Sequence, residues 1–336
     1  MHLRAPAPTP RMPELKSNYR PAWWLPGAHL PTIWGKKGRR QPPVHDRVER
    51  WSTPDSDHIS IARAGHISPD RPHLVVLHGL EGTTRSNYAQ GLLAQARARG
   101  WSADLMLFRC CDGEINNQRR MYHSGETTDL DFVVRTLVAE NPGISLRLVG
   151  VSLGGNVLMK WLGEQGESLV SNVRRAAGVS VPFDLAAGSR FLECTLGQKY
   201  VDHFMKSLKA KTCAKRQDYP DLCDWARLEQ ARTFWDFDDI ATGPVHGFTG
   251  ALDYYTQSSS MSFLHRIRRQ TLLFSAEDDP FLPSSVLDKV RKIANSNDFL
   301  SFEFSKQGGH VGWTEGPPWA PRYYMEERVL CWLDSE

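Results

Sequence analysis

Residues 146–155 read LRLVGVSLGG, and this segment is the strongest indication of the fold. Residues 146–151 form a short apolar run that predicts a buried strand. The run ends in the pattern G-x-S-x-G at positions 150–154, after which apolar residues recur at helical spacing. A strand, a tight turn and a helix in this order project the Ser152 hydroxyl from a strained bend that requires small neighbours. We therefore predict that Ser152 is a nucleophile at a strand-to-helix turn.

Apolar runs of strand length alternate with segments of helical period on both sides of this turn. Strands are predicted at 73–77, 105–108, 146–151, 176–181, 271–275 and 299–304, after an opening hairpin at 47–52 and 58–63. Helices are predicted at 88–99, 130–138 and 325–333. This alternation is typical of an α/β fold with a mostly parallel central sheet and helices on both faces.

Two segments depart from that alternation. Residues 186–262 contain no clear strand and are rich in charged and aromatic residues, so we expect a helical cap inserted over the carboxyl edge of the sheet. Residues 1–20 include the run APAPTP, which can form neither a helix nor a central strand, and we expect a flexible tail there. The α/β core then comprises residues 21–185 and 263–336.

The overall composition excludes several classes of protein. Of the 336 residues, 40% are hydrophobic and 24% are charged, and Lys plus Arg exceed Asp plus Glu by only three (41 − 38). This balance argues against nucleic acid or an anionic membrane as a partner. No run approaches 18 apolar residues, so we expect no stable membrane insertion, and only the Trp-rich segment 21–26 is a candidate for contact with a membrane surface.

The six cysteines and the N-terminus bear on the compartment. The cysteines show no paired CxxC spacing, and the N-terminal residues contain no apolar leader. We therefore expect a cytoplasmic protein with free thiols. The adjacent Cys110 and Cys111 are expected to be small packing residues.

A carboxylate that can orient a histidine follows the predicted strand at 271–275. The segment AEDDPFLP places Asp278 and Asp279 at the end of that strand. Asp279 is favoured because it lies four residues before Pro283, and Asp278 remains the alternative. Both aspartates can also serve simply as turn formers before a proline.

A single histidine flanked by glycines follows the last predicted strand, in QGGHVG at 307–312. Such a loop suits delivery of the His310 imidazole to Ser152. A serine hydroxyl needs a base that takes its proton and later returns it to the leaving alcohol, while an aspartate fixes the imidazole tautomer. The order Ser, Asp, His along the chain is the one expected after this kind of turn.

The loop HGLEG at 78–82 follows the predicted buried strand at 73–77. We expect the backbone N–H groups of Leu80 and Leu153 to form an oxyanion hole, in which each donor typically contributes ~10²–10³ in rate. His78 is expected to hold this loop by hydrogen bonds and to take no part in the chemistry.

Together with other segments, these residues resemble the α/β-hydrolase superfamily. The stretches FRCCDGEIN at 108–116, YHSGET at 122–127 and FWDFDD at 234–239 are similar to the YheT-like branch of bacterial esterases and abhydrolase-domain lipases. The resemblance covers roughly residues 20–334. It implies hydrolysis of carboxylic esters without a cofactor or metal, by a triad of Ser152, Asp279 and His310.

Within these stretches, Cys110 and Asp112 stand where that branch commonly has Gly and Ser, and the extra carboxylate is expected to alter the pocket floor. His123 competes with His310 as a base, but a structural role is favoured for it. We expect Ser124 and Glu126 to cap the helix that follows.

Arg109 and the acidic residues at 236–239 lie in the same stretches, and we predict that they stabilise the fold and take no part in the chemistry. Arg109 is expected to pair with a carboxylate. The acidic residues at 236–239 are expected to serve packing or ion pairing, because carboxylates without histidine make a poor transition-metal site.

Three functions remain open from the sequence. The first is a serine esterase that acts on a small-molecule acyl ester, with a lipid ester among the options. The second is an acyltransferase that passes the acyl group to an acceptor other than water. The third is a non-catalytic binding protein on the same fold, against which the complete set of Ser152, Asp279 and His310 argues. An aspartate nucleophile is disfavoured because the turn carries Ser152.

Overall fold

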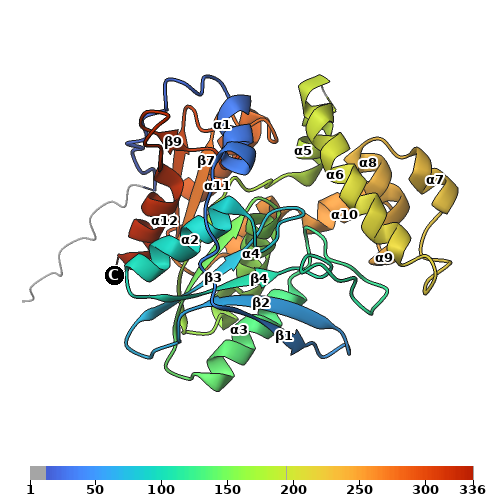
Figure 1. The fold of residues 1–336 in the computed structure, drawn as a ribbon, viewed down its shortest axis with the longest axis horizontal. Helices are drawn as coiled ribbons and strands as arrows, with labels where there is room; N and C mark the ends of the chain where they lie inside the picture. The colour runs from blue at the N-terminus through green and yellow to red at the C-terminus, as the bar shows by residue number, and fades with distance from the viewer. Residues whose placement is uncertain (1–12, 194, 336) are drawn as a thin grey trace, which may run out of the picture.

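The computed structural model describes residues 13–193 and 195–335, and an eight-stranded sheet lies at its centre (Figure 1). The strands of this sheet are β1 (Arg47–Ser52), β2 (His58–Ala64), β3 (Pro72–Leu77), β4 (Ser102–Leu107), β5 (Ser145–Val151), β6 (Val173–Val179), β7 (Thr271–Ala276) and β8 (Leu300–Ser305). They lie in the order β1-β2-β4-β3-β5-β6-β7-β8. Only β2 runs antiparallel to its neighbours β1 and β4, so the sheet is mostly parallel, as predicted. A small second sheet pairs β9 (Thr314–Glu315) with β10 (Arg322–Tyr323).

The helices of the described residues fall into three groups along the chain. Those before β6 are α1 (His29–Ile33), the π-helical η1 (Trp34–Gly38), α2 (Asn87–Ala98), α3 (Thr128–Glu140), α4 (Leu153–Gln165) and the 3₁₀ segment η2 (Gly166–Ser168). Those between β6 and β7 are α5 (Leu185–Phe191), α6 (Thr195–Ala214), α7 (Trp225–Gln230), α8 (Phe234–Phe237), the π-helical η3 (Asp238–Thr242), α9 (Gly243–Val245), α10 (Ala251–Ser258) and the 3₁₀ segment η4 (Ser260–Arg266). The last two are α11 (Ser284–Asn295) and α12 (Tyr324–Asp334).

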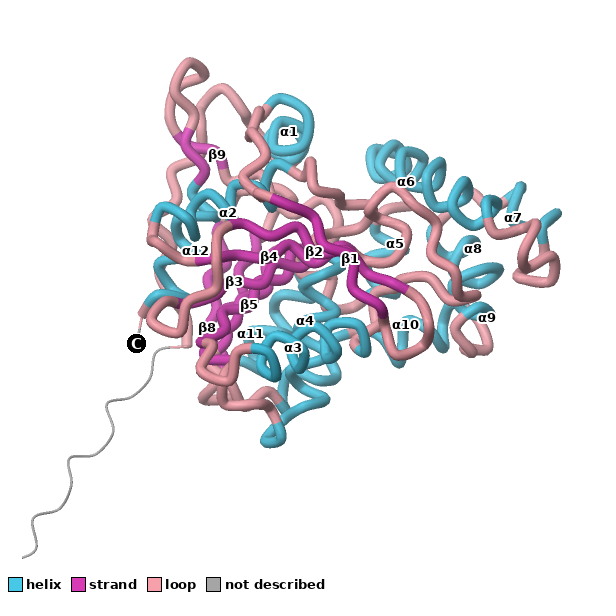
Figure 2. The backbone as a smooth tube through the Cα atoms, turned by 60° about the horizontal axis from the view of Figure 1, so that its bottom comes forward, coloured by secondary structure: helices cyan, strands magenta, loops and turns pink. Residues whose placement is uncertain are grey.

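Helices cover both faces of the sheet (Figure 2). On one face α3, α4 and α11 share an apolar cluster with side chains such as Leu148 of β5. On the other face α2 and α12 share a second cluster with Val149 of the same strand. Successive side chains of a strand point to opposite faces, so a strand buried on both sides is mostly apolar along its length. This explains why the strand predictions from continuous apolar runs were correct.

The segment before Pro21 differs in part from the predicted tail of residues 1–20. Residues 1–12 lie outside the described residues. Glu14 forms a parallel bridge with Phe302 of β8, and the Leu15 N–H donates to the Phe302 carbonyl at 2.7 Å. Leu15 and Tyr19 pack against the cluster on the α2 and α12 face. Residues 13–19 are therefore no loose tail, because the open edge of β8 and these apolar side chains hold them.

The chain between β6 and β7 is helical, and it lies at the right of Figure 1. Residues of α6, α7, α8 and η3 form an apolar cluster of their own, which includes Val201, Met205, Leu228 and Phe237. Leu264 of η4 belongs instead to the large cluster beneath the sheet. The division into a cap at 186–262 and a core at 21–185 and 263–336 stays a prediction. Across residues 13–193 and 195–335, we find no helix with the length and apolar character needed to cross a membrane.

Candidate active site

The turn between β5 and α4 holds Ser152 in a strained conformation. Ser152 has φ +53° and ψ −121°, a region that residues other than glycine rarely adopt. A Cβ atom at Gly150 would lie 2.3 Å from the Gly154 carbonyl oxygen. A Cβ atom at Gly154 would lie 2.5 Å from the His78 carbonyl oxygen. Both glycines are therefore required by close backbone packing, which leaves the Ser152 side chain at the end of the strand.

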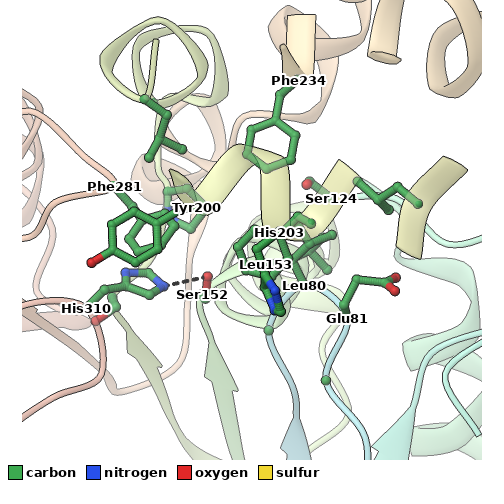
Figure 3. A pocket seen from close by; sticks show the side chains of 18 of the residues that line it. Leu80, Glu81, Ser124, Ser152, Leu153, Tyr200, His203, Phe234, Phe281 and His310 are labelled. Atoms are coloured by element: carbon green, nitrogen blue, oxygen red, sulfur yellow. Dashed lines mark hydrogen bonds between the residues drawn. The ribbon is translucent and has the colours of Figure 1, made fainter. Parts of the chain in front are cut away.

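The loop after β8 brings His310 to Ser152 (Figure 3). The His310 Nε2 atom lies 2.9 Å from Ser152 Oγ, within hydrogen-bonding distance. The backbone N–H of His310 donates to Thr32 Oγ1 at 2.8 Å, and the N–H of Val311 donates to Ser180 Oγ at 3.3 Å. These bonds tie the histidine loop to α1 and to the end of β6.

Of the two candidate aspartates, Asp279 is the one that meets His310. The His310 Nδ1 atom lies 2.9 Å from Asp279 Oδ2 and 3.1 Å from Oδ1. A proton on Nδ1 that points to this carboxylate leaves Nε2 free to accept from the Ser152 hydroxyl. Asp278 instead accepts a hydrogen bond from the Gly309 N–H at 2.9 Å, and burial raises the pKa of its carboxyl. Asp278 therefore supports the histidine loop.

The loop after β3 lies beside Ser152. A Cβ atom at Gly79 would lie 3.1 Å from the Ser152 Cβ atom, so the backbone leading to Leu80 passes directly alongside the serine. Leu153 is the first residue of α4, where backbone N–H groups have no partner within the helix. In the described part of the chain, no acceptor takes the N–H of Leu80 or of Leu153. Both predicted donors therefore remain available next to Ser152.

His78 holds this loop, as expected from the sequence. Its Nε2 atom accepts from the Phe108 N–H at 3.1 Å, and its Nδ1 atom lies 2.7 Å from the Gly79 carbonyl oxygen. Burial lowers the pKa of His78 to about 4, which keeps the ring neutral near pH 7. Both ring nitrogens are thus used in structural contacts.

A second support for the loop was missed by sequence reasoning. The Tyr122 hydroxyl contacts Glu81, the residue after Leu80, and Lys211 of α6 donates to Glu81 Oε1 at 2.8 Å. Burial opposes ionisation of Glu81, but the Lys211 ammonium group and these hydrogen bonds bring its pKa below the usual value. Tyr122 is 41 positions from Glu81, so no local pattern links the two.

The Ser152 hydroxyl opens into a cavity of about 700 Å³. The ends of β3, β5, β7 and β8 contribute residues to its wall, and so do helices of the segment between β6 and β7. Much of the wall is apolar or aromatic, with side chains that include Leu192, Leu208, Phe234, Phe237, Tyr254 and Phe281. A concave, mostly apolar cavity with a few polar groups is the usual form of a small-molecule site.

His123, the competing histidine, also lines this cavity but makes other contacts. Its Nδ1 atom accepts from the Gly125 N–H at 3.1 Å, and its ring packs 4.5 Å from that of His246. Burial, followed by the nearby His246, lowers the pKa of His123 well below its usual value. No bond joins it to Ser152 within the described residues.

Of the two residues predicted to cap α3, Glu126 does so and Ser124 does not. Glu126 Oε1 accepts from the Thr128 N–H at 2.7 Å, as a cap does. The prediction for Ser124 was wrong, because among the described residues its Oγ atom accepts from no N–H group at the start of α3. Its backbone is bonded to α10 and α4 instead, since its N–H donates to the Tyr254 hydroxyl at 2.9 Å and its carbonyl accepts from Asn156.

The expected ion pair of Arg109 is present. Its guanidinium group donates to Asp129 at 2.7 Å and to Asp57 at 2.8 Å, and all three side chains are buried. The acidic residues at 236–239 are also used locally. Asp236 completes a capping box with Thr233, Asp238 accepts from the Tyr255 hydroxyl at 2.7 Å, and Asp239 accepts from the Ala251 N–H. These contacts fit the predicted packing role.

Cys110 and Asp112, which follow β4 and differ from the Gly and Ser common in the YheT-like branch, lie in different surroundings. Cys110 lines the cavity and has φ +63°, which explains why glycine suits this position. The expectation that Asp112 alters the pocket floor was wrong. Asp112 accepts from Ser60 Oγ of β2 at 2.7 Å, and it is not among the residues that line the cavity. Cys111 is buried in the large apolar cluster, as expected for a packing residue.

Comparisons with known proteins agree with this fold. A family model described as "alpha/beta hydrolase fold" matches residues 72–317. Among solved structures, 2,6-dihydroxy-pseudo-oxynicotine hydrolase superposes with a TM-score of 0.56 at 17% sequence identity, covering 87% of this chain and 67% of that one. An identity this low supports the fold alone. The fold and these matches define an α/β hydrolase.

Two relatives of similar sequence show to which family within this superfamily the chain belongs. "Putative esterase YheT" of Escherichia coli is 37% identical over 311 residues, which cover 91% of this chain and 90% of that protein. The monoacylglycerol lipase of Saccharomyces cerevisiae is 28% identical over 292 residues, which cover 80% of this chain and 62% of that protein. The chain thus belongs to the α/β-hydrolase superfamily and, within it, to the esterase and lipase family that includes YheT.

Proposed function

We propose that this chain is a serine esterase that hydrolyses acyl esters through a covalent intermediate on Ser152. The observation that carries the proposal is the sequence of contacts from Ser152 Oγ to His310 Nε2 at 2.9 Å and from His310 Nδ1 to Asp279 at 2.9 Å. A nucleophile in contact with a base, which a third group orients, is the arrangement that activates a serine hydroxyl.

The proposed reaction has two halves. Ser152 Oγ attacks the ester carbonyl carbon while its proton moves to His310 Nε2, and the oxyanion accepts hydrogen bonds from the N–H groups of Leu80 and Leu153. The bond to the alcohol then breaks, and His310 returns the proton to the leaving alcohol oxygen. In the second half water attacks the acyl carbonyl carbon and gives a proton to His310. The bond from the acyl group to Ser152 Oγ then breaks, His310 returns the proton to Oγ, and the acid is released. Asp279 stabilises the imidazolium in both halves.

The class of ester follows from the cavity wall and from the relatives. Aromatic and aliphatic side chains around Ser152 suit an acyl chain. A relative named as a monoacylglycerol lipase favours lipid esters among the candidates. We therefore propose a small amphiphilic acyl ester as the substrate.

The test is hydrolysis of p-nitrophenyl esters of increasing acyl length by the wild type and by Ser152→Ala. The wild type should turn over these esters, and the variant should lose nearly all turnover, of order 10⁶ in a reference serine hydrolase. Retention of more than a few per cent of the wild-type rate by a folded Ser152→Ala variant would refute the nucleophile. Labelling of Ser152 by a fluorophosphonate probe reports an activated serine independently of the ester chosen.

A further inference from the structure

Two lysines and a histidine meet across one rim of the cavity. Lys36 and Lys37 belong to η1, and His203 belongs to α6 on the opposite side. The Lys36 Nζ atom lies 2.9 Å from His203 Nε2, and all three residues line the cavity that contains Ser152. All three are exposed to solvent, so a ligand can reach them from outside.

No carboxylate of the described residues forms an ion pair with this group, although the Glu81 carboxylate, which pairs with Lys211, also attracts Lys36. Among the residues that the structure describes, Lys36, Lys37 and the neighbouring Lys206 form no salt bridge. Lys211, which lies on the same helix as His203, is different because it pairs with Glu81 at 2.8 Å. The rim thus keeps unpaired cations although the chain as a whole carries a net charge of only +3.

The surroundings of Lys36 and His203 disfavour the protonated forms of both side chains. Partial burial of the side chain and then the positive charge of Lys37 lower the pKa of Lys36, and the Glu81 carboxylate opposes this shift. Burial and then the positive charges of Lys36, Lys37 and Lys206 lower the pKa of His203. The ammonium groups of Lys36 and Lys37 repel each other, and an anion placed between them would offset that repulsion and accept hydrogen bonds from the rim.

Contacts along α6 connect the rim to the catalytic histidine. Tyr200 lies one turn before His203 on α6, and its ring packs 4.8 Å from that of Phe281. The Phe281 ring in turn packs 4.2 Å from the His310 imidazole. Figure 3 shows Tyr200, Phe281 and His203 among the side chains that surround Ser152. Because Lys36, Lys37, His203 and Ser152 line the same cavity, a ligand in that cavity can contact both the rim and the serine.

We propose that the ester substrate carries an anionic group, a phosphate or a carboxylate, and that Lys36, Lys37 and His203 bind this group at the rim of the cavity. The ester carbonyl then lies at Ser152, and the acyl chain lies against the apolar wall. This inference rests on the proposed esterase function, because it assigns a second recognition element to the same substrate. The site selects substrates by charge, whereas the apolar wall selects them by chain length.

The first experiment compares two esters with the same acyl chain, octanoylglycerol phosphate and octanoylglycerol, at low ionic strength. The wild type should show a kcat/KM about tenfold higher for the phosphate ester, since a hydrogen bond to a charged group is typically worth this much. Lys36→Met keeps the aliphatic stem and removes the charge, so the ratio of the two kcat/KM values should fall towards one through a higher KM for the phosphate ester. Lys36→Arg should retain the ratio.

Lys289→Met is the matched control, because Lys289 is exposed on α11 and does not line the cavity. This control should have the wild-type ratio. The proposal is overturned if the wild type does not prefer the phosphate ester, or if Lys36→Met lowers kcat/KM for both esters by the same factor. Added salt should also reduce the preference, since exposed charges are screened.

Binding to Ser152→Ala separates this inference from the proposed function. Calorimetric titration with the same two compounds needs no turnover. Tighter binding of octanoylglycerol phosphate supports the anion site even if no ester is hydrolysed, and equal affinity overturns it even if the chain is an active esterase. Repeating the titration with monomeric ligand and with ligand in neutral phosphatidylcholine vesicles shows whether the anion comes from a free amphiphile or from a lipid surface.

Discussion

The phenolic oxygen of Tyr122 forms two hydrogen bonds with Glu81, donating to Oε1 at 2.6 Å and accepting from the backbone N–H at 3.0 Å. Glu81 has φ +56° and directly follows Leu80, whose N–H is a proposed oxyanion donor. One hydroxyl group therefore holds both the backbone and the side chain of a strained residue in this loop. Lys211 adds a bond from α6 to the same carboxylate.

Tyr122→Phe should lower kcat by about tenfold with little change in KM, a fraction of the effect expected from loss of a whole oxyanion donor. The reason is that Glu81 loses both bonds and the Leu80 N–H loses its alignment. Steady-state kinetics on a p-nitrophenyl ester measure kcat and KM of the variant and of the wild type. Tyr219→Phe is the control, because the Tyr219 hydroxyl bonds only to the Asn117 carbonyl away from the cavity. A rise in KM alone would show that Tyr122 acts on substrate binding instead.

Asp279→Asn should reduce kcat by about 10⁴, as the loss of the orienting carboxylate does in a reference serine protease. Asp278→Asn should cost far less, because an asparagine oxygen can still accept from the Gly309 N–H. Measurement of kcat for both variants under the same conditions shows which aspartate orients His310. Equal losses, or a larger loss for Asp278→Asn, would reassign the acid.

Gly154→Ala should destabilise the fold and reduce activity. Its Cβ atom would lie 2.5 Å from the His78 carbonyl oxygen and 2.6 Å from that of Leu77, so backbone must move. Overpacking of this kind typically costs about 1–3 kcal/mol. Gly143→Ala is the matched control, because the nearest atom to its Cβ would be 3.7 Å away. Urea unfolding of both variants measures the difference, and equal midpoints would contradict the steric argument.

Asp238 should make stability depend on pH. Burial raises the pKa of its carboxyl from 3.8 to about 6. A carboxyl whose pKa is higher in the folded state contributes stability that is complete below pH 3.8 and is lost as the pH rises through about 6. Asp238→Asn is neutral throughout and still accepts from the Tyr255 hydroxyl. Its Tm should therefore match the wild type near pH 4 and exceed it above pH 7. A difference in Tm that is constant with pH would show that Asp238 does not titrate in this range.

Local pattern was enough to predict the fold, the strands of the main sheet and the helices α2, α3, α4 and α12. The apolar run before Gly150, the glycines after Ser152 and the helical period that follows act between neighbours in the chain, so they are visible in the sequence. The same holds for the strand ends that carry His78, Asp279 and His310, since parallel strands bring such ends to one edge. The predicted helix cap at Ser124 was wrong, because residues distant in the chain, on α10 and α4, bond to Ser124.

Short-range sterics and hydrophobic periodicity suffice to predict the strand–turn–helix around Ser152 and the α/β architecture, so both follow from the amino-acid order alone. Which of two adjacent aspartates faces His310 depends on the folded loop, because neighbouring side chains point in different directions there. The same is true of the Tyr122–Glu81 contact, the packing of residues 13–19 on β8, and the cationic rim. Each of these joins segments that are distant in the chain, and the folded backbone alone brings them together.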